Sequence, residues 1–155
     1  MSATIRPATR EDREFVLAAA RRLGEFDTPP WRTPEEIVEG EARTLRRHFE
    51  EPAEGAALLI AEASPGAPLG FAYVETIVDY FTGRSHAHVG ILAVAREGEG
   101  RGAGRALLEA AERWARSRGD ALLTLNVFEA NRHARAVYDH LGFRPETLRY
   151  VKPLA

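Results

Sequence analysis

The chain has 155 residues, of which 45% are hydrophobic and 28% charged; this composition excludes disordered and fibrous proteins and suits one globular domain. The formal net charge of −2 argues against a nucleic-acid partner, and the absence of cysteine excludes disulfides, thiolate metal sites and a cysteine nucleophile. With no run of 18 apolar residues and no signal-peptide core, we expect a cytoplasmic protein that has no membrane partner.

The first third of the sequence predicts one strand followed by two helices. Residues 4–6 are expected to form the strand. Thr9, with Asp12 three residues later, predicts the N-terminal cap of the first helix. Thr33 followed by Pro34 predicts the start of the second helix, because proline is favoured at the first helical position.

The middle of the sequence predicts three strands. Residues 56–63 and 69–78 are separated by a turn rich in proline and glycine, so we expect them to pair as a hairpin. Residues 85–94 predict a third strand, in which simple alternation places His86, His88, Gly90, Leu92 and Val94 on one face. This strand leads directly into a glycine-rich stretch.

The rest of the sequence predicts a helix, a strand, a second helix and a final strand. The first of these helices is expected to end at Gly119, and residues 121–127 predict the strand after it. Asn131 is expected to cap the second helix, and Gly142 followed by Phe143 predicts that it ends in a Schellman motif. Residues 148–151 predict the final strand. We expect residues 1–155 to form a single domain.

The glycine-rich stretch between residues 98 and 104 is the strongest functional signal. A strand that enters glycines at a helix N-terminus exposes backbone N–H groups, and these groups bind phosphate. A P-loop is excluded because the only lysine is Lys152. The letters from Gly98 to Ala103 also fit the dinucleotide-binding pattern, with Glu129 near the end of the next strand, but only 26 residues follow Glu129.

A longer set of motifs extends over nearly the whole chain. Leu92-x-Val94, Gly100-x-Gly102-x-Gly104 and Ala106-Leu107-Leu108 occur in order, and Asn131, Ala134, Tyr138 and Leu141-Gly142-Phe143 follow. An opening passage from Thr4 to Asp12 precedes them. This arrangement resembles the GNAT-type N-acetyltransferases, which use acetyl-CoA.

The resemblance implies an α/β (α+β) fold with a mixed central β-sheet, whose central strands splay apart, flanked by about four helices. It implies an enzyme that transfers an acetyl group from acetyl-CoA to a primary amine by direct attack in a ternary complex. The acceptor is expected to be a small molecule or a peptide or protein N-terminus, and the protein a monomer or homodimer. Acetyl-CoA is a co-substrate, and no metal is expected.

By resemblance, the residues expected to bind coenzyme A lie in three places. The backbone of the third strand is expected to hold the pantetheine arm, the amides of the glycine stretch the pyrophosphate, and Asn131 to lie beside the arm. The set comprises Leu92, Ala93, Val94, Gly100, Arg101, Gly102, Ala103, Gly104, Arg105 and Asn131. The sequence departs from the family at Glu99, which replaces the usual Arg or Gln; Arg101 and Arg105 are expected to offset its charge.

Two residues are expected to carry catalysis. Tyr138, two helical turns after Asn131, matches the family tyrosine that protonates the leaving thiolate. His88 occupies a strand position where some members carry a glutamate, so it is the expected general base. Glu75 and an ordered water chain are the alternatives for that base.

Two other functions stay open at this point. The first is a non-catalytic acyl-CoA-binding or sensor module on the same fold, which would bind coenzyme A without turnover. The second is a fragment of a dinucleotide-binding oxidoreductase, which would bind NAD instead of coenzyme A.

Overall fold

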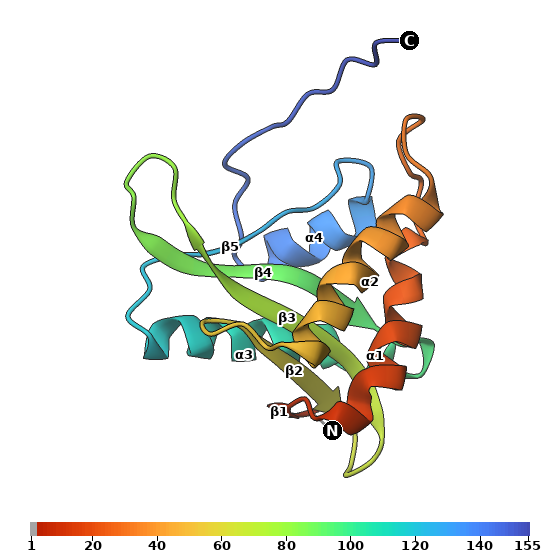
Figure 1. The fold of residues 1–155 in the computed structure, drawn as a ribbon, viewed down its shortest axis with the longest axis vertical. Helices are drawn as coiled ribbons and strands as arrows, with labels where there is room; N and C mark the ends of the chain where they lie inside the picture. The colour runs from red at the N-terminus through yellow and green to blue at the C-terminus, as the bar shows by residue number, and fades with distance from the viewer. Residues whose placement is uncertain (1–2) are drawn as a thin grey trace.

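The computed structural model describes residues 3–155, and its centre is a five-stranded sheet with the strand order β1-β2-β3-β4-β5 (Figure 1). The strands are β1 (Thr4–Pro7), β2 (Ala57–Glu62), β3 (Pro68–Val78), β4 (Ser85–Val94) and β5 (Leu123–Leu125). The first three neighbouring pairs are antiparallel and the last pair is parallel. The mixed sheet confirms the expected fold class, and its antiparallel pairs contradict the dinucleotide-binding alternative, which requires a parallel sheet.

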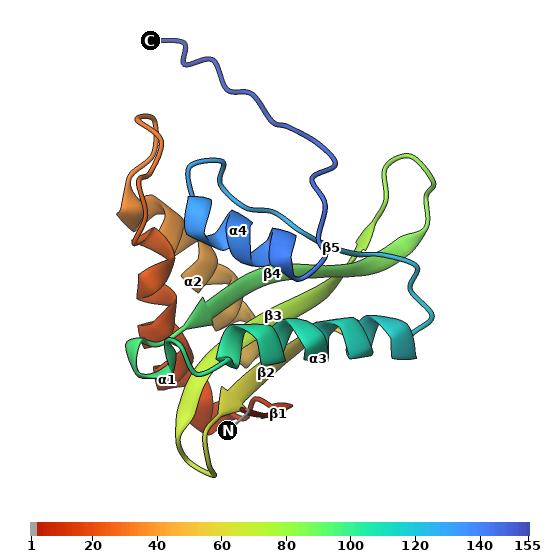
Figure 2. The same cartoon turned by 180° about the vertical axis from the view of Figure 1, so that it is seen from behind.

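Four α-helices cover the sheet on both faces (Figures 1 and 2). They are α1 (Arg13–Ala20), α2 (Pro34–Glu50), α3 (Ala103–Ser117) and α4 (Arg132–His140). On one face, α1 and α2 bury Val16 and Leu45 against Phe71 of β3. On the other, α3 buries Leu107 against the same sheet, and α4 packs beside it. Among residues 3–155, no helix has the length and apolar character to cross a membrane.

The boundaries of α2 and α4 follow the caps that the sequence predicts, whereas Thr9 caps a 3₁₀ turn, Arg10–Asp12, and α1 begins only after it at Arg13. The Thr33 hydroxyl accepts the N–H of Glu36 at 3.1 Å, and α2 begins at Pro34. Asn131 Oδ1 likewise accepts the N–H of Ala134 at the start of α4. This helix ends in the expected Schellman motif, because Phe143 donates to the carbonyl of Tyr138 and Gly142, at φ +91°, donates to that of Asp139.

A β-bulge at Gly90 divides β4 into two halves. The extra residue shifts by one position the alternation of side chains between the two faces of the sheet. Tyr73 of β3 pairs with Ile91 and the next residue, Val74, pairs with Val89, so Gly90 has no partner. Ile91 packs with Tyr73 against α1 and α2, whereas Val89 packs with Val74 against α3.

This bulge corrects the simple alternation expected for β4. Leu92 and Val94 face α3. His86 and His88 alternate with Val89 and therefore face α2, on the opposite side of the sheet. Gly90 lies at the point where the facing changes.

The end of the chain also differs from expectation. β5 has three residues rather than the seven of 121–127, because it pairs with β4 alone and only over three positions. Residues 148–151 form no strand: the segment after Phe143 has no regular structure and extends away from the sheet (Figures 1 and 2). A strand requires a partner, and this segment pairs with none of the other described residues.

Asp12 joins the first strand to the first helix, and its removal should weaken the fold. It is 6% exposed, accepts two 2.8 Å hydrogen bonds from Arg6, and accepts the N–H of Thr9 at 2.7 Å. Asp12→Asn should destabilise the protein by about 2–3 kcal/mol, because breaking a buried ion pair costs about 3–5 kcal/mol and Arg6 is partly exposed. Urea unfolding at pH 7 measures the loss, and the exposed Asp139→Asn should show none.

The stabilities of the wild-type protein and of Asp12→Asn should also depend differently on pH. The hydrogen bonds from Arg6 are the main cause that lowers the pKa of Asp12. A carboxylate whose pKa is lowered in the folded state stabilises the fold above its unfolded pKa, near 3.8, and loses this contribution as the pH falls through the folded value. The stability gap to Asp12→Asn should therefore be complete at pH 7 and narrow below about pH 4. A gap that is constant from pH 7 to pH 3 would contradict this role.

Candidate active site

The two central strands, β4 and β5, part beyond Val89. The last β4 residue that pairs with β5 is Val89, opposite Leu125, so residues 90–94 have no β5 partner. Ala95 donates its N–H to the carbonyl of Leu69 on β3, and backbone groups alternate between the two edges of an antiparallel strand. The N–H and C=O groups of Leu92 and Val94 therefore point into the gap between the strands. These two residues thus present an open strand edge, on which, within the described part of the chain, only the Val94 carbonyl already accepts a hydrogen bond, from Arg22.

The gap leads to the N-terminus of α3, where the glycines leave backbone groups open. Gly100 and Gly102 have φ of +70° and +76°, and space is open around the position of a Cβ at each. Gly104 lies in the first turn of α3, whose leading N–H groups have no partner within the helix. These amides, at the positive end of the helix dipole, form a surface suited to phosphate.

The Glu99 carboxylate forms an ion pair with Arg22, a partner that the sequence does not predict. The Arg22 guanidinium pairs with the Glu99 carboxylate, donates to the carbonyl of Val94 at 2.9 Å and contacts Glu25 at 3.0 Å. This pairing is the main cause that lowers the pKa of Glu99. Arg22 lies 77 residues before Glu99, and no local pattern marks the pair. The negative charge beside the glycine loop is thus neutralised by a residue of the 3₁₀ turn that follows α1.

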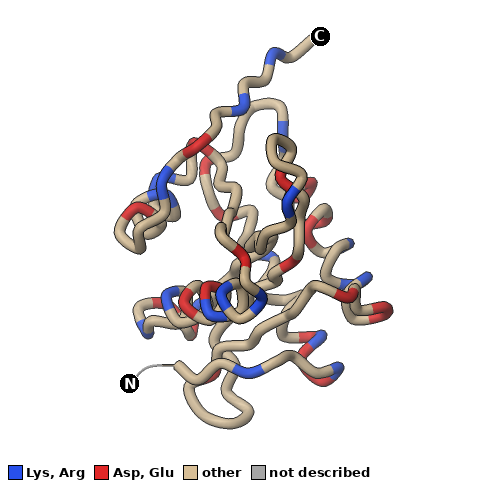
Figure 3. The backbone as a smooth tube through the Cα atoms, turned by 90° about the vertical axis from the view of Figure 1, so that its left-hand side faces the viewer, with Lys and Arg blue, Asp and Glu red and all other residues tan. Residues whose placement is uncertain are grey.

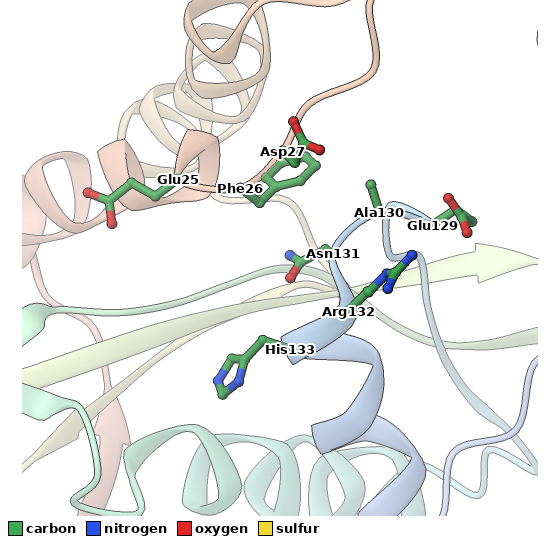
Figure 4. Close-up of a pocket in the computed structure, with 8 residues that line it drawn as sticks. All are labelled: Glu25, Phe26, Asp27, Glu129, Ala130, Asn131, Arg132 and His133. Carbon is green, nitrogen blue, oxygen red and sulfur yellow. The ribbon is translucent and has the colours of Figure 1, made fainter.

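A pocket of about 480 Å³ lies between the loop after Arg22 and the start of α4 (Figure 4). Phe26 lies on one side and Asn131, Arg132 and His133 on the other. The remaining lining residues are Glu25, Asp27, Glu129 and Ala130. The rings of Phe26 and Phe128 are 5.0 Å apart, so the two sides of the pocket contact each other directly. Asn131 therefore lines a cavity as well as capping its helix.

Carboxylates gather at the bulge, on the face that α2 covers. A Cβ on Gly90 would lie 2.5 Å from Oε2 of Glu75, so the missing side chain makes the room that this carboxylate fills. Burial raises the pKa of Glu75. Burial, and then the charge of Glu75, raise the pKa of Glu41 on α2. The two acids thus share one partly buried site where β4 begins to part from β5.

His88 lies opposite Glu75 in the β3–β4 register and is tied to β5. Its Nδ1 lies 2.7 Å from the hydroxyl of Thr124, and Nε2 of His86 lies 3.1 Å from the same oxygen. Burial is the main cause that lowers the pKa of His88, so the imidazole is neutral at pH 7. The three side chains hold β4 and β5 together immediately before the gap opens.

Tyr138 lies on α4, on the side of the sheet that faces α3. It packs against the cluster of Val74, Val89 and Leu108, and its ring meets that of Phe143 edge-on at 5.8 Å. Burial raises the pKa of the phenol, so the hydroxyl keeps its proton at neutral pH. A protonated phenol in this position is a hydrogen-bond donor.

The structure brings most of the expected residues around one gap. Leu92 and Val94 border it and the glycine loop follows its end, while Asn131 lines the pocket at the start of α4. Ala93 differs, because its methyl is buried in the core and its backbone faces β3. Arg105 is exposed and pairs with Glu109 at 2.9 Å, while Arg101 is exposed on the glycine loop.

Comparison with known proteins gives consistent findings. Residues 18–143 match the model of the Acetyltransferase (GNAT) family. An aminoglycoside N(6′)-acetyltransferase type 1 from Stenotrophomonas maltophilia is 38% identical over 102 residues, 64% of this chain. That match spans 65% of the relative, so the chain covers slightly less than two thirds of its length.

Solved structures show the same fold over nearly the whole chain. A proposed acetyl transferase from Pyrococcus furiosus has a TM-score of 0.77 at 25% identity, covering 99% of this chain and all of that one. The aminoglycoside N-acetyltransferase AAC(6′)-Iy, solved in complex with CoA, has a TM-score of 0.72 at 22% identity. There the match covers 99% of this chain and 94% of the other.

Two alanine variants with the same backbone strain test whether the glycine loop binds coenzyme A. Gly102→Ala should weaken the binding of coenzyme A at least about tenfold, since an alanine at φ +76° costs about 1–2 kcal/mol and the loop must rearrange. Gly119→Ala places the same strain, at φ +78°, at the opposite end of α3 and should leave the affinity unchanged. Calorimetric titration with coenzyme A compares the two. Equal affinity in both variants would mean that the phosphates bind elsewhere.

Proposed function

We propose that this chain, which belongs to the Acetyltransferase (GNAT) family, transfers an acetyl group from acetyl-CoA to a primary amine. The observation that carries the proposal is the unpaired edge of β4 from Gly90 to Val94, which runs from a pair of carboxylates to the glycine loop. A ligand with a peptide-like arm and a pyrophosphate fits this path from end to end.

Acetyl-CoA has the two parts that the path requires. Its pantetheine amides would hydrogen-bond to the edge groups of Leu92 and to the N–H of Val94 as an added strand. Its pyrophosphate would accept hydrogen bonds from the amides between Gly100 and Arg105, and Asn131 would lie beside the arm. This placement would bring the thioester to the bulge at Gly90, where the strands begin to part.

The acceptor would approach from the α2 face, where the acidic side chains lie. Glu41 and Glu75 present negative charge there, and Asp27 and Glu129 add acids along the neighbouring pocket. A cationic amine is attracted by such a site, and an acceptor with several amines more strongly. These acids support a small polycationic amine as the acceptor class. A peptide N-terminus, which carries a single amine, is supported less.

We assign the general base to Glu75 and a hydrogen-bond donor role to His88, because the contacts with Thr124 fix the tautomer of His88. Nδ1 of His86 is buried and has no hydrogen-bond partner among residues 3–155. A buried N–H without a partner is rarer than a buried lone pair, so the His86 proton belongs on Nε2 and is donated to Thr124. The Thr124 hydroxyl then donates to Nδ1 of His88, whose own proton is on Nε2. In this state His88 donates at the site and cannot accept a proton there.

The reaction then needs three proton transfers. The cationic amine loses a proton to the Glu75 carboxylate, and its lone pair attacks the carbonyl carbon of the thioester. The C–N bond forms, the C–S bond breaks, and the coenzyme A thiolate takes the proton of the Tyr138 hydroxyl. The surplus proton of the new amide nitrogen returns to the Tyr138 phenolate, and Glu75 releases its proton to solvent. The partly buried Glu75 carboxylate is a stronger base than an exposed one because desolvation raises its pKa.

Release of free coenzyme A thiol from acetyl-CoA tests the function directly. The acceptors are an aminoglycoside, a linear polyamine, an amino acid and a peptide with an N-terminal alanine, each at several concentrations. We expect amine-dependent release of thiol, fastest with the polycationic amines, and a mass increase of one acetyl group on the acceptor. Coenzyme A binding without turnover on the whole panel would favour a sensor module, and no binding would contradict the proposal.

Variants of Glu75 and His88 distinguish the two possible bases. Glu75→Gln should lower kcat by about 10²–10⁴-fold and remove the acidic limb of the pH–rate profile, whose rate falls as the pH drops through the raised pKa of Glu75. His88→Gln should keep that limb and lower the rate less. A limb that survives in Glu75→Gln and disappears in His88→Gln would assign the base to His88.

A glycine variant tests the same carboxylate without changing it. Gly90→Ala puts a methyl group 2.5 Å from the Glu75 oxygen and must displace it, so kcat should fall although both candidate bases are intact. Gly40→Ala on α2, whose methyl meets only the end of Arg43 at 3.9 Å, is the control and should be fully active. Normal kcat in Gly90→Ala would contradict the placement of Glu75.

Tyr138→Phe separates the acid role from packing. The phenylalanine keeps the contacts with Val89 and Phe143 and removes only the hydroxyl, so stability and coenzyme A affinity should stay unchanged. kcat should fall by about 10²–10⁴-fold, the usual contribution of a general acid. Wild-type turnover in a folded Tyr138→Phe variant would leave this side chain with a packing role alone.

A further inference from the structure

A ligand with phosphate groups gains little from the overall charge of this protein. The formal net charge of the chain is −2. Basic and acidic residues are interspersed along the backbone, as the blue and red segments of Figure 3 show. General attraction between the protein and an anion is therefore weak, and phosphates have to be bound by particular cations at the site.

The glycine loop itself offers little positive charge from its own side chains. Nε of Arg105, in the first turn of α3, donates to Glu109 at 2.9 Å. Arg101 is exposed, and exposed ion pairs contribute little. Glu99 directly precedes Gly100 and adds a negative charge. A well-held cation for the phosphates therefore has to come from another part of the chain.

Arg22 places a guanidinium at this point. It lies in the 3₁₀ turn Arg21–Gly24, which follows α1. Nη1 donates to the carbonyl of Val94 at 2.9 Å, Nη2 pairs with Glu99, and Nε donates to Glu25 at 3.0 Å. The side chain is 22% exposed, so its surroundings restrict it while part of it still reaches solvent. The guanidinium thus has a fixed place between the end of the open β4 edge and the start of the glycine loop.

These contacts leave part of the donor capacity of Arg22 unused. A guanidinium carries five N–H groups, one on Nε and two on each Nη. Among residues 3–155, each of the three nitrogens has one partner, so one N–H group of each Nη remains. Phosphate oxygens are the acceptors for which a guanidinium is best suited. Arg22 can therefore bind a phosphate without giving up its contact with Val94.

We infer that Arg22 is the side-chain cation that binds the pyrophosphate of coenzyme A. Its remaining N–H groups donate to phosphate oxygens, while the Val94 carbonyl keeps the guanidinium at the end of β4. The turn after α1 thereby supplies the positive charge that position 99 lacks. Glu99 holds the same guanidinium but repels the phosphates, so it weakens binding. The inference rests on the proposed function and adds a residue to its ligand site.

Removal of Glu99 distinguishes phosphate binding by Arg22 from mere neutralisation of that carboxylate. Calorimetric titration with coenzyme A compares Glu99→Gln with Glu99→Gln/Arg22→Gln, which both lack the charge that Arg22 would neutralise. Loss of a direct hydrogen bond to a charged group should weaken binding by the double variant about tenfold or more. Equal affinities in the two variants would overturn the inference. Glu99→Gln alone should bind coenzyme A more tightly than the wild type, and weaker binding would contradict the role given to Glu99.

Two controls determine whether the loss belongs to the phosphates. Pantetheine, the arm without phosphate, should bind Glu99→Gln and the double variant equally, and an equal loss for both ligands would mean that Arg22 acts only through Val94. Glu99→Gln/Arg96→Gln removes the same charge from a residue that contacts Glu25 at 2.6 Å. Because the side chain of Arg96 is 68% exposed, coenzyme A affinity should change less than about threefold. A loss as large as that of the Arg22 variant would indicate general attraction and contradict the inference.

Nitrogen-15 NMR of the arginine side chains observes the contact in the unmodified protein. The Nε–H resonance of Arg22, identified by its absence in Arg22→Lys, should shift when coenzyme A is added to saturation. An unchanged resonance would overturn the inference while leaving coenzyme A binding intact. If the wild-type protein did not bind coenzyme A at all, the proposed function itself would be contradicted, and the inference with it.

Discussion

The site depends on one constraint, the hydrogen-bonding capacity of the β4 edge. Backbone N–H and C=O groups of a central strand must find partners, yet β5 leaves β4 after three paired positions. The carbonyl of Val94 is one of the groups released, and the guanidinium of Arg22 meets it. The remaining edge is free for a ligand that carries its own amides. The bulge at Gly90 lies at the start of this edge, and His88 and Glu75, which pair with each other just before it, lie on the face from which an acceptor would come.

The arginine side chains link this edge to the rest of the molecule. Arg22 joins Glu99 of the glycine loop, Glu25 of the pocket and Val94 of β4, and Arg96 reaches Glu25 at 2.6 Å. A planar guanidinium donates in several directions at once, which an ammonium group on a single stem does less well. The loop that would receive the phosphates is thereby tied to the loop that lines the pocket, so both sides of the path keep their relative position.

Much of this arrangement was predictable from local sequence, and the remainder depends on contacts across the sheet. The caps at Thr33 and Asn131, the Schellman ending at Gly142 and the limits of β4 follow from residues within one turn or one strand. The bulge was not predictable in this way, because an alternating pattern continues unbroken through Gly90 and only pairing with β3 shows the shift. The same holds for Arg22 and Glu99. Residues 148–151 have the propensity of a strand but do not form one. Propensity specifies an extended chain, whereas a strand also requires a partner.

The cations of this protein have a further chemical consequence. Of its 21 basic residues 20 are arginine, and the one lysine, Lys152, lies in the irregular segment that follows Phe143. A guanidinium stays protonated at any physiological pH and is a poor nucleophile, whereas an ε-amine reacts readily with thioesters. If acetyl-CoA binds as proposed, the positive charges of the protein surface are therefore almost all inert toward its thioester. Chemical self-modification through side-chain amines is confined to a single position, far along the chain from the glycine loop.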